Sequence, residues 1–97
     1  MTPLERHEAR LREIGCVVCR REGRGFVPAA LHHIAEGSGL RSDWAQVPLC
    51  QTHHQGAQGL HNSGLGLKRF LSIYRPPGES EWGLLAWAME DLAKFST

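Results

Sequence analysis

The sequence predicts a small α+β domain in which two short extended segments and a short helix are cross-linked by metal, with a longer helix at either end. All three cysteines and five of the six histidines fall in three clusters between residues 16 and 61. Apolar residues have helical spacing near both ends of the chain. At 97 residues, a metal cross-link would add useful stability to a modest hydrophobic core. We expect one domain over residues 1–97, with a core at about 16–75 and flanking helices at 3–14 and 80–95.

The first helix has a clear start and end signal. Thr2 is a suitable N-cap, Pro3 suits the first helical position, and Glu5 completes a capping box. Gly15 can end the helix. The apolar stripe consists of Leu4, Leu11 and Ile14.

The middle of the chain has the pattern of an irregular hairpin followed by a helical turn. Residues 20–25 are charged and contain glycine, which predicts a loop. Residues 26–34 and, more weakly, 44–49 are typical of extended segments, with a glycine-rich turn at 37–39 between them. A short helix is expected at 51–55, before glycines make a longer one unfavourable.

Two further helices are predicted after residue 66. The first is indicated by Leu67, Phe70, Leu71 and Tyr74. The sequence Pro76-Pro77-Gly78 ends it, and Ser80 can cap the next helix. We expect the last helix to bury one apolar face, formed by Trp82, Leu85, Met89 and Leu92.

Composition restricts the redox state and location. Three cysteines cannot all pair in disulfides, and the N-terminus does not resemble a signal peptide. No apolar run is long enough to cross a bilayer. We therefore expect a cytoplasmic protein with reduced, metal-bound thiolates. The net charge of +1 argues neither for nor against a nucleic-acid partner.

Two ligand pairs with the same spacing predict a structural zinc site. Cys16 and Cys19 are separated by two residues, as are Cys50 and His53. This spacing lets both members of a pair reach one ion from a tight turn, so the four form a Cys3His set. The alternative is that Cys50 is an ordinary small buried residue and no zinc binds.

Once His53 is assigned to zinc, His32 and His33 are the first of the histidines that remain to be explained. Adjacent residues on a strand point to opposite faces, so the two cannot have the same role.

The other two histidines that remain to be explained are His54 and His61. They would lie about 10.5 Å apart along an unbroken helix, too far for two ligands of one ion. Gly56 and Gly59 let the chain leave the helix and fold His61 back. The alternative is that these four histidines are surface or core residues with no shared role.

The motifs together resemble the HNH, or ββα-metal, nuclease superfamily. The pattern is CxxC, then His-His-Ile before a glycine-rich turn, then Pro-Leu-Cys-x2-His-His and a later His. Within it, Ser42-Asp43-Trp44, Gly59-Leu60-His61 and the later Phe70 and Tyr74 are most similar to phage proteins related to the RecA-dependent nuclease Ref. The resemblance covers residues 16–95. It implies a small ββα-metal (HNH) domain with a zinc knuckle and flanking helices.

The resemblance also implies roles for the four remaining histidines. His33 matches the general base, while His32, His54 and His61 match ligands of a catalytic divalent cation. Three imidazoles suit zinc, nickel or manganese better than magnesium, although magnesium can still support turnover. Cys16, Cys19, Cys50 and His53 match the structural zinc set.

Two positions bear on how such a site would work. Many superfamily members carry an Asn shortly before the second zinc pair, whereas this chain has none there; Gln46, Asp43 or a backbone carbonyl can take its place. Arg41, in the loop after His33, is a candidate phosphate contact, with a solvated surface arginine as the alternative reading.

The resemblance implies metal-dependent hydrolysis of DNA phosphodiester bonds in phage or prophage recombination or DNA processing, in the cytoplasm of a bacterial host cell. The expected partners are DNA and a recombinase filament such as RecA. No association with a membrane is expected. A non-catalytic zinc module that binds DNA or protein is one alternative, and a ribonuclease with the same site is another. Neither the oligomeric state nor the target preference follows from the sequence.

Overall fold

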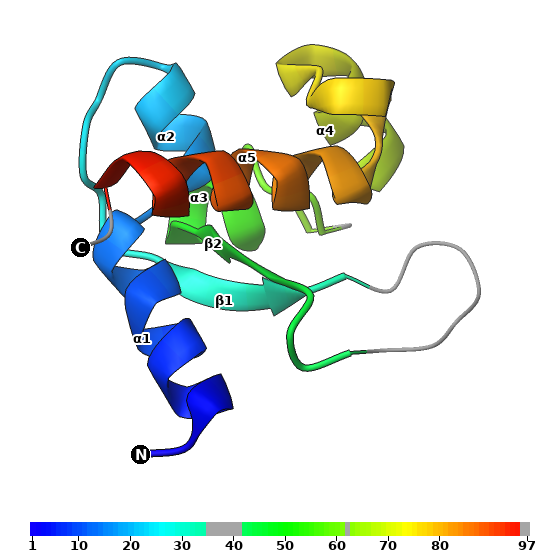
Figure 1. Cartoon of the computed structure of the whole chain (residues 1–97). Coiled ribbons are helices and arrows are strands. Elements are labelled where there is room, and N and C mark those ends of the chain that lie inside the picture. The colour runs from blue at the N-terminus through cyan, green and yellow to red at the C-terminus, as the bar shows by residue number, and fades with distance from the viewer. Residues whose placement is uncertain (35–41, 62, 96–97) are drawn as a thin grey trace.

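The computed structural model describes residues 1–34, 42–61 and 63–95 (Figure 1). Across these residues, no helix combines the length and apolar character that a membrane crossing requires. The elements in chain order are α1 (Pro3–Ile14), α2 (Val17–Arg21), β1 (Ala30–His33), β2 (Gln46–Leu49), α3 (Gln51–His54), α4 (Leu67–Tyr74), the 3-10 turn η1 (Pro77–Glu79) and α5 (Glu81–Phe95).

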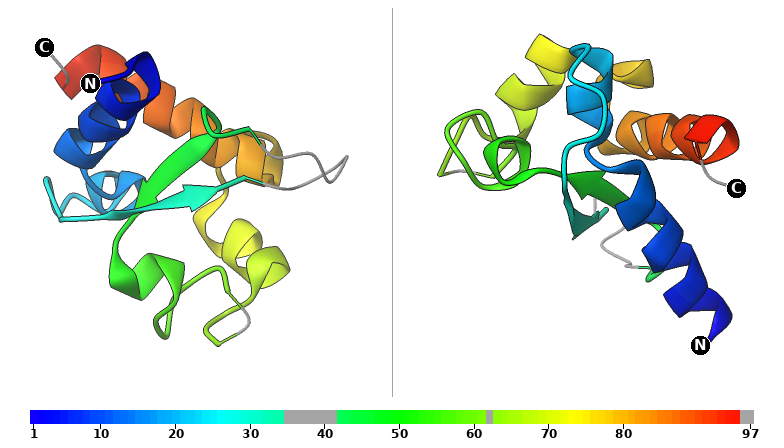
Figure 2. Two further views of the ribbon diagram at one scale, coloured as in Figure 1. Left: turned by 90° about the horizontal axis from the view of Figure 1, so that it is seen from below. Right: turned by 90° about the vertical axis from the view of Figure 1, so that its left-hand side faces the viewer.

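The centre of the fold is a two-stranded antiparallel hairpin followed by a helical turn. Strand β1 pairs with β2 so that Ala30 lies opposite Leu49 and His33 opposite Gln46. Every residue of β2 is buried. Helices α1 and α5 lie on one side of the hairpin and α3 on the other (Figure 2). The arrangement β1–β2–α3 with flanking helices confirms the small α+β fold expected from the sequence and is consistent with a ββα-metal domain.

Helix α1 begins and ends where the local signals predict. The Thr2 hydroxyl accepts from the Glu5 backbone N–H at 3.1 Å, and the Thr2 backbone N–H donates to the Glu5 carboxylate at 2.8 Å. Gly15 ends the helix at φ +74°, where a Cβ would lie 2.6 Å from the Val27 carbonyl oxygen. The chain therefore turns sharply at Gly15, and the next N–H, that of Cys16, donates to the same Val27 carbonyl at 3.0 Å.

Helix α2 was not expected from the sequence. Residues 20 and 21 belong to this five-residue helix instead of to a loop. A long-range contact stabilises it: the guanidinium of Arg21, which also donates to the Val17 carbonyl of the same helix at 3.2 Å, donates to the Asp91 carboxylate of α5 at 2.6 Å. The strands are also shorter than the extended segments expected at 26–34 and 44–49. The turn expected at 37–39 lies outside the described residues.

The last two helices correct one expectation about the core. In α4, Phe70 and Leu71 are buried as expected. In α5, however, Trp82 and Met89 are 49% and 41% exposed, so the face expected from the sequence was wrong for these two residues. Leu85 is partly buried and Leu92 is buried.

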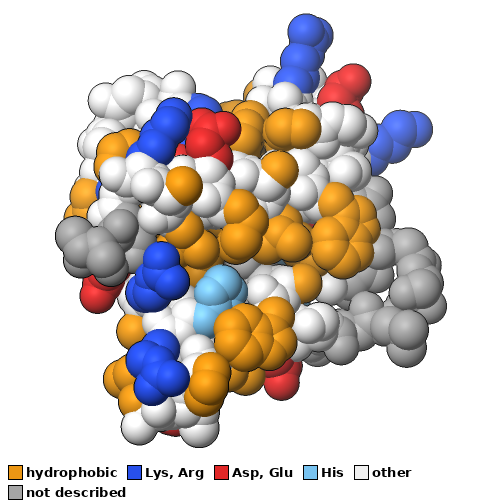
Figure 3. All heavy atoms as spheres, in the orientation of Figure 1, with side chains coloured by type: hydrophobic (Ala, Val, Ile, Leu, Met, Phe, Trp, Pro, Cys, Tyr) orange, Lys and Arg blue, Asp and Glu red, His pale blue; other side chains and the backbone are white. Residues whose placement is uncertain are grey.

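The face of α5 that enters the core contains Leu84, Ala88 and Leu92, which have i, i+4 spacing. Two carboxylates, Glu81 and Asp91, are buried on this helix as well. Their partners on other elements therefore set the rotation of the helix. As a result, hydrophobic side chains remain on the surface along α5 (Figure 3).

Candidate active site

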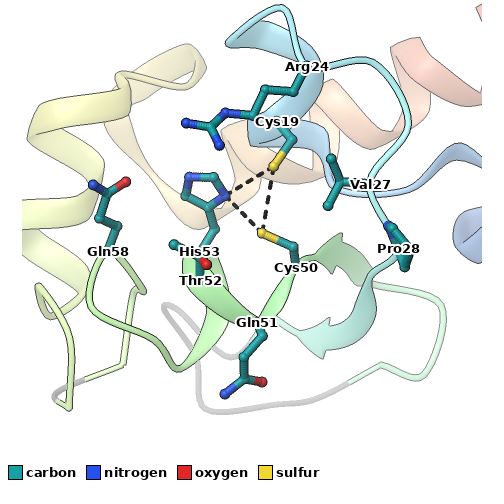
Figure 4. A pocket seen from close by; sticks show the side chains of 9 residues that line it. All are labelled: Cys19, Arg24, Val27, Pro28, Cys50, Gln51, Thr52, His53 and Gln58. Atoms are coloured by element: carbon teal, nitrogen blue, oxygen red, sulfur yellow. Dashed lines mark hydrogen bonds between the residues drawn. The ribbon is translucent and has the colours of Figure 1, made fainter.

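The four residues of the expected zinc set come together from two helix starts. Cys16 is the N-cap of α2 and Cys19 lies in its first turn. Cys50 is the N-cap of α3 and His53 lies in that helix. Figure 4 shows Cys19, Cys50 and His53 pointing toward one another. All four are buried, and one ligand atom from each lies within 4.8 Å of the others.

The separations between these atoms match a tetrahedral zinc site. The Nδ1 atom of His53 lies 3.5 Å from the sulfur of Cys16, 3.5 Å from that of Cys19 and 3.1 Å from that of Cys50. The sulfurs of Cys19 and Cys50 are 3.6 Å apart. A tetrahedron with Zn–S bonds of about 2.3 Å and a Zn–N bond of about 2.1 Å has edges of about 3.6–3.8 Å. The cluster can therefore hold zinc with little rearrangement.

The electrostatics of the cluster also favour a cation. Burial raises the pKa of the Cys16 and Cys19 thiols, and charge repulsion among the cysteines adds to this effect. Burial lowers the pKa of His53, and nearby Glu22 partly offsets that shift. A bound divalent cation would supply the positive charge that three neighbouring thiolates need.

The second ring nitrogen of His53 has a carboxylate beside it. His53 Nε2 is buried and makes no hydrogen bond of good geometry to the described residues, but Glu22 Oε1 lies 3.2 Å away. Metal-binding histidines commonly direct their other nitrogen at such a group. Glu22 follows α2, so the same short segment supplies two thiols and the partner of the imidazole.

A second cluster forms from three of the remaining histidines. His32 comes from β1, His54 is the last residue of α3, and His61 lies in the loop that follows. One nitrogen from each lies within 4.8 Å of the others. The Nε2 atoms of His54 and His61 are 3.2 Å apart, close to the edge of about 3.3 Å between two imidazole ligands of a tetrahedral ion. The three can therefore bind one metal ion.

The loop after α3 returns to the helix, as the glycines predict. The His61 N–H donates to the His54 carbonyl at 3.3 Å. A Cβ at Gly59 would lie 2.6 Å from that same carbonyl oxygen, so only glycine allows so close an approach. This contact places His61 beside His54 despite their separation of seven residues.

The lowered pKa of one residue of the second cluster, His54, favours metal binding. Burial lowers the pKa of His54, and the neighbouring His32 and His61 lower it further. A neutral imidazole keeps a lone pair for a metal ion. The cluster thus presents nitrogen ligands and no thiolate, which separates it chemically from the Cys3His set.

His33 lies outside both clusters. It follows His32 on β1, and its Nε2 lies 3.4 Å from Asp43 Oδ1. Its side chain is 27% exposed, so water can reach the imidazole. Arg41, the candidate phosphate contact, lies outside the described residues.

Sequence reasoning missed one residue at the second cluster. The Glu81 carboxylate, in the first turn of α5, lies 2.6 Å from His32 Nε2. A glutamate in this position is typical of a helix start, so nothing in the local sequence marked it as different. Its burial would have been the signal, and burial depends on where α5 packs.

A pocket of about 310 Å³ lies beside the Cys3His cluster, between Arg24 and Gln58 (Figure 4). Of the described residues that line it, none belongs to the second cluster. The pocket therefore lies away from the three imidazoles, the side chains that could hold a catalytic ion.

The fold and the two clusters define a small α+β domain with two sets of side chains that could each hold a metal ion. A family model described as "Recombination enhancement, RecA-dependent nuclease" matches residues 2–93. The chain therefore belongs to this family of nucleases, which confirms the resemblance to RecA-dependent nucleases. No curated protein matches the chain, and no solved structure does.

Proposed function

We propose that the protein is a metal-dependent endonuclease of the HNH type that hydrolyses DNA phosphodiester bonds during RecA-dependent recombination. The observation that carries this proposal is the convergence of His32, His54 and His61 beside a separate Cys3His cluster. One cluster suffices to stabilise a small domain, so a second set of nitrogen ligands needs another explanation. Membership of a nuclease family supplies it.

In this proposal, His33 is the general base. It directly follows His32 at the end of β1, which is the position that the HNH pattern gives to the base. A neutral imidazole accepts a proton from the attacking water. A divalent cation bound by the three histidines would neutralise charge on the scissile phosphate and on the departing oxygen. Zinc, nickel, manganese and magnesium are the candidates.

The contacts of the turn before β2 support this role for His33. The Asp43 carboxylate lies beside His33 Nε2, where it can orient the ring and leave Nδ1 as the acceptor. The Gln46 amide donates to the Asp43 backbone carbonyl and, at 2.7 Å, to the Glu8 carboxylate of α1. Asp43 and Gln46 thus share the task of the Asn that the HNH pattern would place here.

The low net charge of +1 is consistent with help from a partner. Affinity for DNA depends on the number of phosphates that a protein neutralises, and this chain offers little excess positive charge. We therefore propose that a RecA filament on DNA brings the enzyme to its substrate, which would account for the RecA dependence in the description of its family.

The test combines metal content with plasmid nicking, with and without a RecA filament. Wild-type protein should bind two ions per chain and nick DNA. His33→Ala should keep both ions and the fold but lose nicking. His7→Ala is the matched control, because His7 lies outside both clusters. Nicking by His33→Ala at the wild-type rate would remove His33 as the base.

The same experiment, extended to single-stranded DNA and RNA substrates, separates the two alternatives. A non-catalytic zinc module predicts one ion per chain and no nicking with any metal. A ribonuclease predicts cleavage of RNA but of neither single-stranded nor duplex DNA.

A further inference from the structure

The contact between Glu81 and His32 joins two segments far apart in the sequence. Glu81 Oε2 lies 2.6 Å from His32 Nε2, although the two residues are 49 positions apart in the chain. Their side chains are only 6% and 12% exposed. Burying a carboxylate is costly unless it has a partner, so the imidazole that contacts it is part of what keeps Glu81 in this position.

The geometry determines which nitrogen of His32 is free. A carboxylate oxygen accepts hydrogen bonds, so the hydrogen of a neutral His32 lies on Nε2 and is donated to Glu81. The lone pair then lies on Nδ1. His54 and His61, by contrast, present Nε2 to one another.

Glu81 contacts the ligand and is not itself part of the ligand group. Among the described residues, the set whose ligand atoms all lie within 4.8 Å contains His32, His54 and His61 but not Glu81. This is the arrangement in which a carboxylate orients a metal-binding imidazole and raises its basicity.

We infer that Glu81 is the positioning residue of the second metal site: it directs His32 Nδ1 at the ion by accepting the Nε2 hydrogen. The inference rests on the proposed metal site at the three histidines. It makes the start of α5 part of the site, whereas the sequence suggested only a covering helix.

The packing of α5 holds Glu81 in place. The Gly83 N–H donates to the Ser80 hydroxyl at 3.3 Å, which caps the helix. A Cβ at Gly83 would overlap the Pro77 carbonyl oxygen, so the first turn of α5 lies tightly against η1. Further along, the Asp91 carboxylate is paired with Arg21 at 2.6 Å. These contacts prevent the helix from sliding or rotating away from β1.

Manganese and zinc titrations of the protein with its structural zinc retained will test the role of Glu81. Glu81→Ala should weaken binding of the second ion about 10- to 100-fold while leaving the first ion bound. Glu81→Gln keeps an acceptor oxygen and should lose less. Glu90→Gln is the control, since it changes another carboxylate of α5, one that is half exposed and belongs to neither cluster, and it should leave the affinity for the second ion unchanged.

Nitrogen-15 NMR of the wild-type protein provides a readout that does not depend on any variant folding. His32 should carry its hydrogen on Nε2, and added metal should shift Nδ1. A hydrogen on Nδ1, second-ion binding equal to wild type in Glu81→Ala, or no second ion in wild type would each overturn the inference.

These outcomes are distinguishable from failure of the proposed function. If the second ion binds in a Glu81-dependent manner but DNA is not nicked, the function is wrong and the inference stands. If DNA is nicked and Glu81→Ala binds the ion as tightly as wild type, the inference is wrong and the function stands.

Discussion

Loss of the structural zinc should have a large and calculable effect on stability. The zinc would cross-link α2 to the start of α3, because Cys19 and Cys50 are 31 residues apart in sequence yet have sulfurs 3.6 Å apart. Closing a loop of this length removes conformational entropy from the unfolded chain worth about 3.7 kcal/mol at 25 °C. A small domain has a total free energy of unfolding of about 5–15 kcal/mol, so this cross-link is a large fraction of it.

The perturbation is Cys19→Ala, measured by thermal and urea unfolding with zinc and with a chelator. In zinc, wild type should unfold about 15–30 °C higher than in chelator, since 1 kcal/mol shifts the midpoint of a domain of this size by about 4–8 °C. In Cys19→Ala this difference should vanish, because the buried cluster has lost a ligand.

Val18→Ala is the matched control. Val18 is adjacent to Cys19 and just as deeply buried, and its truncation should cost about 2 kcal/mol. The variant should nevertheless keep the full difference between zinc and chelator. A Cys19→Ala protein that remained as stable as wild type while free of zinc would refute the assignment of the Cys3His cluster.

Two further predictions concern the packing of α5. Asp91→Asn should lower the free energy of unfolding by about 2 kcal/mol in urea titrations: loss of a buried ion pair costs more, but Arg21 is partly solvated. A change below about 0.5 kcal/mol would mean that the pair contributes little. Gly83→Ala should destabilise the protein by about 1–3 kcal/mol, because the added methyl overlaps the Pro77 carbonyl; it should also weaken second-ion binding by displacing Glu81. If Gly83→Ala were instead more stable than wild type, as the helix propensity of alanine alone predicts, this would show that η1 can move to make room for the methyl group.

Several parts of the fold were predictable because their causes are local. The Thr2–Glu5 capping box involves residues three apart, and its hydrogen bonds form as expected. Cys16 and Cys19, and likewise Cys50 and His53, are one helical turn apart, so the spacing alone indicates that the two side chains of each pair can point at a common position. The role of Gly59 is also local, because the turn back to His54 requires a residue without a side chain at that point.

The rotation of α5 could not be predicted in this way. A stripe through Trp82 and Met89 and one through Leu84 and Ala88 both fit helical spacing, and the first contains larger apolar side chains. The structure buries the second stripe.

The sequence by itself determined the ligand types, their spacing in pairs and the helix start that precedes them, because short-range geometry governs all three. Only the tertiary structure decided which face of α5 is buried and that Glu81 reaches the second cluster. The physical reason is that a buried carboxylate must have a partner. The partners of Glu81 and Asp91 lie 49 and 70 residues away in the chain, where no local pattern can indicate them.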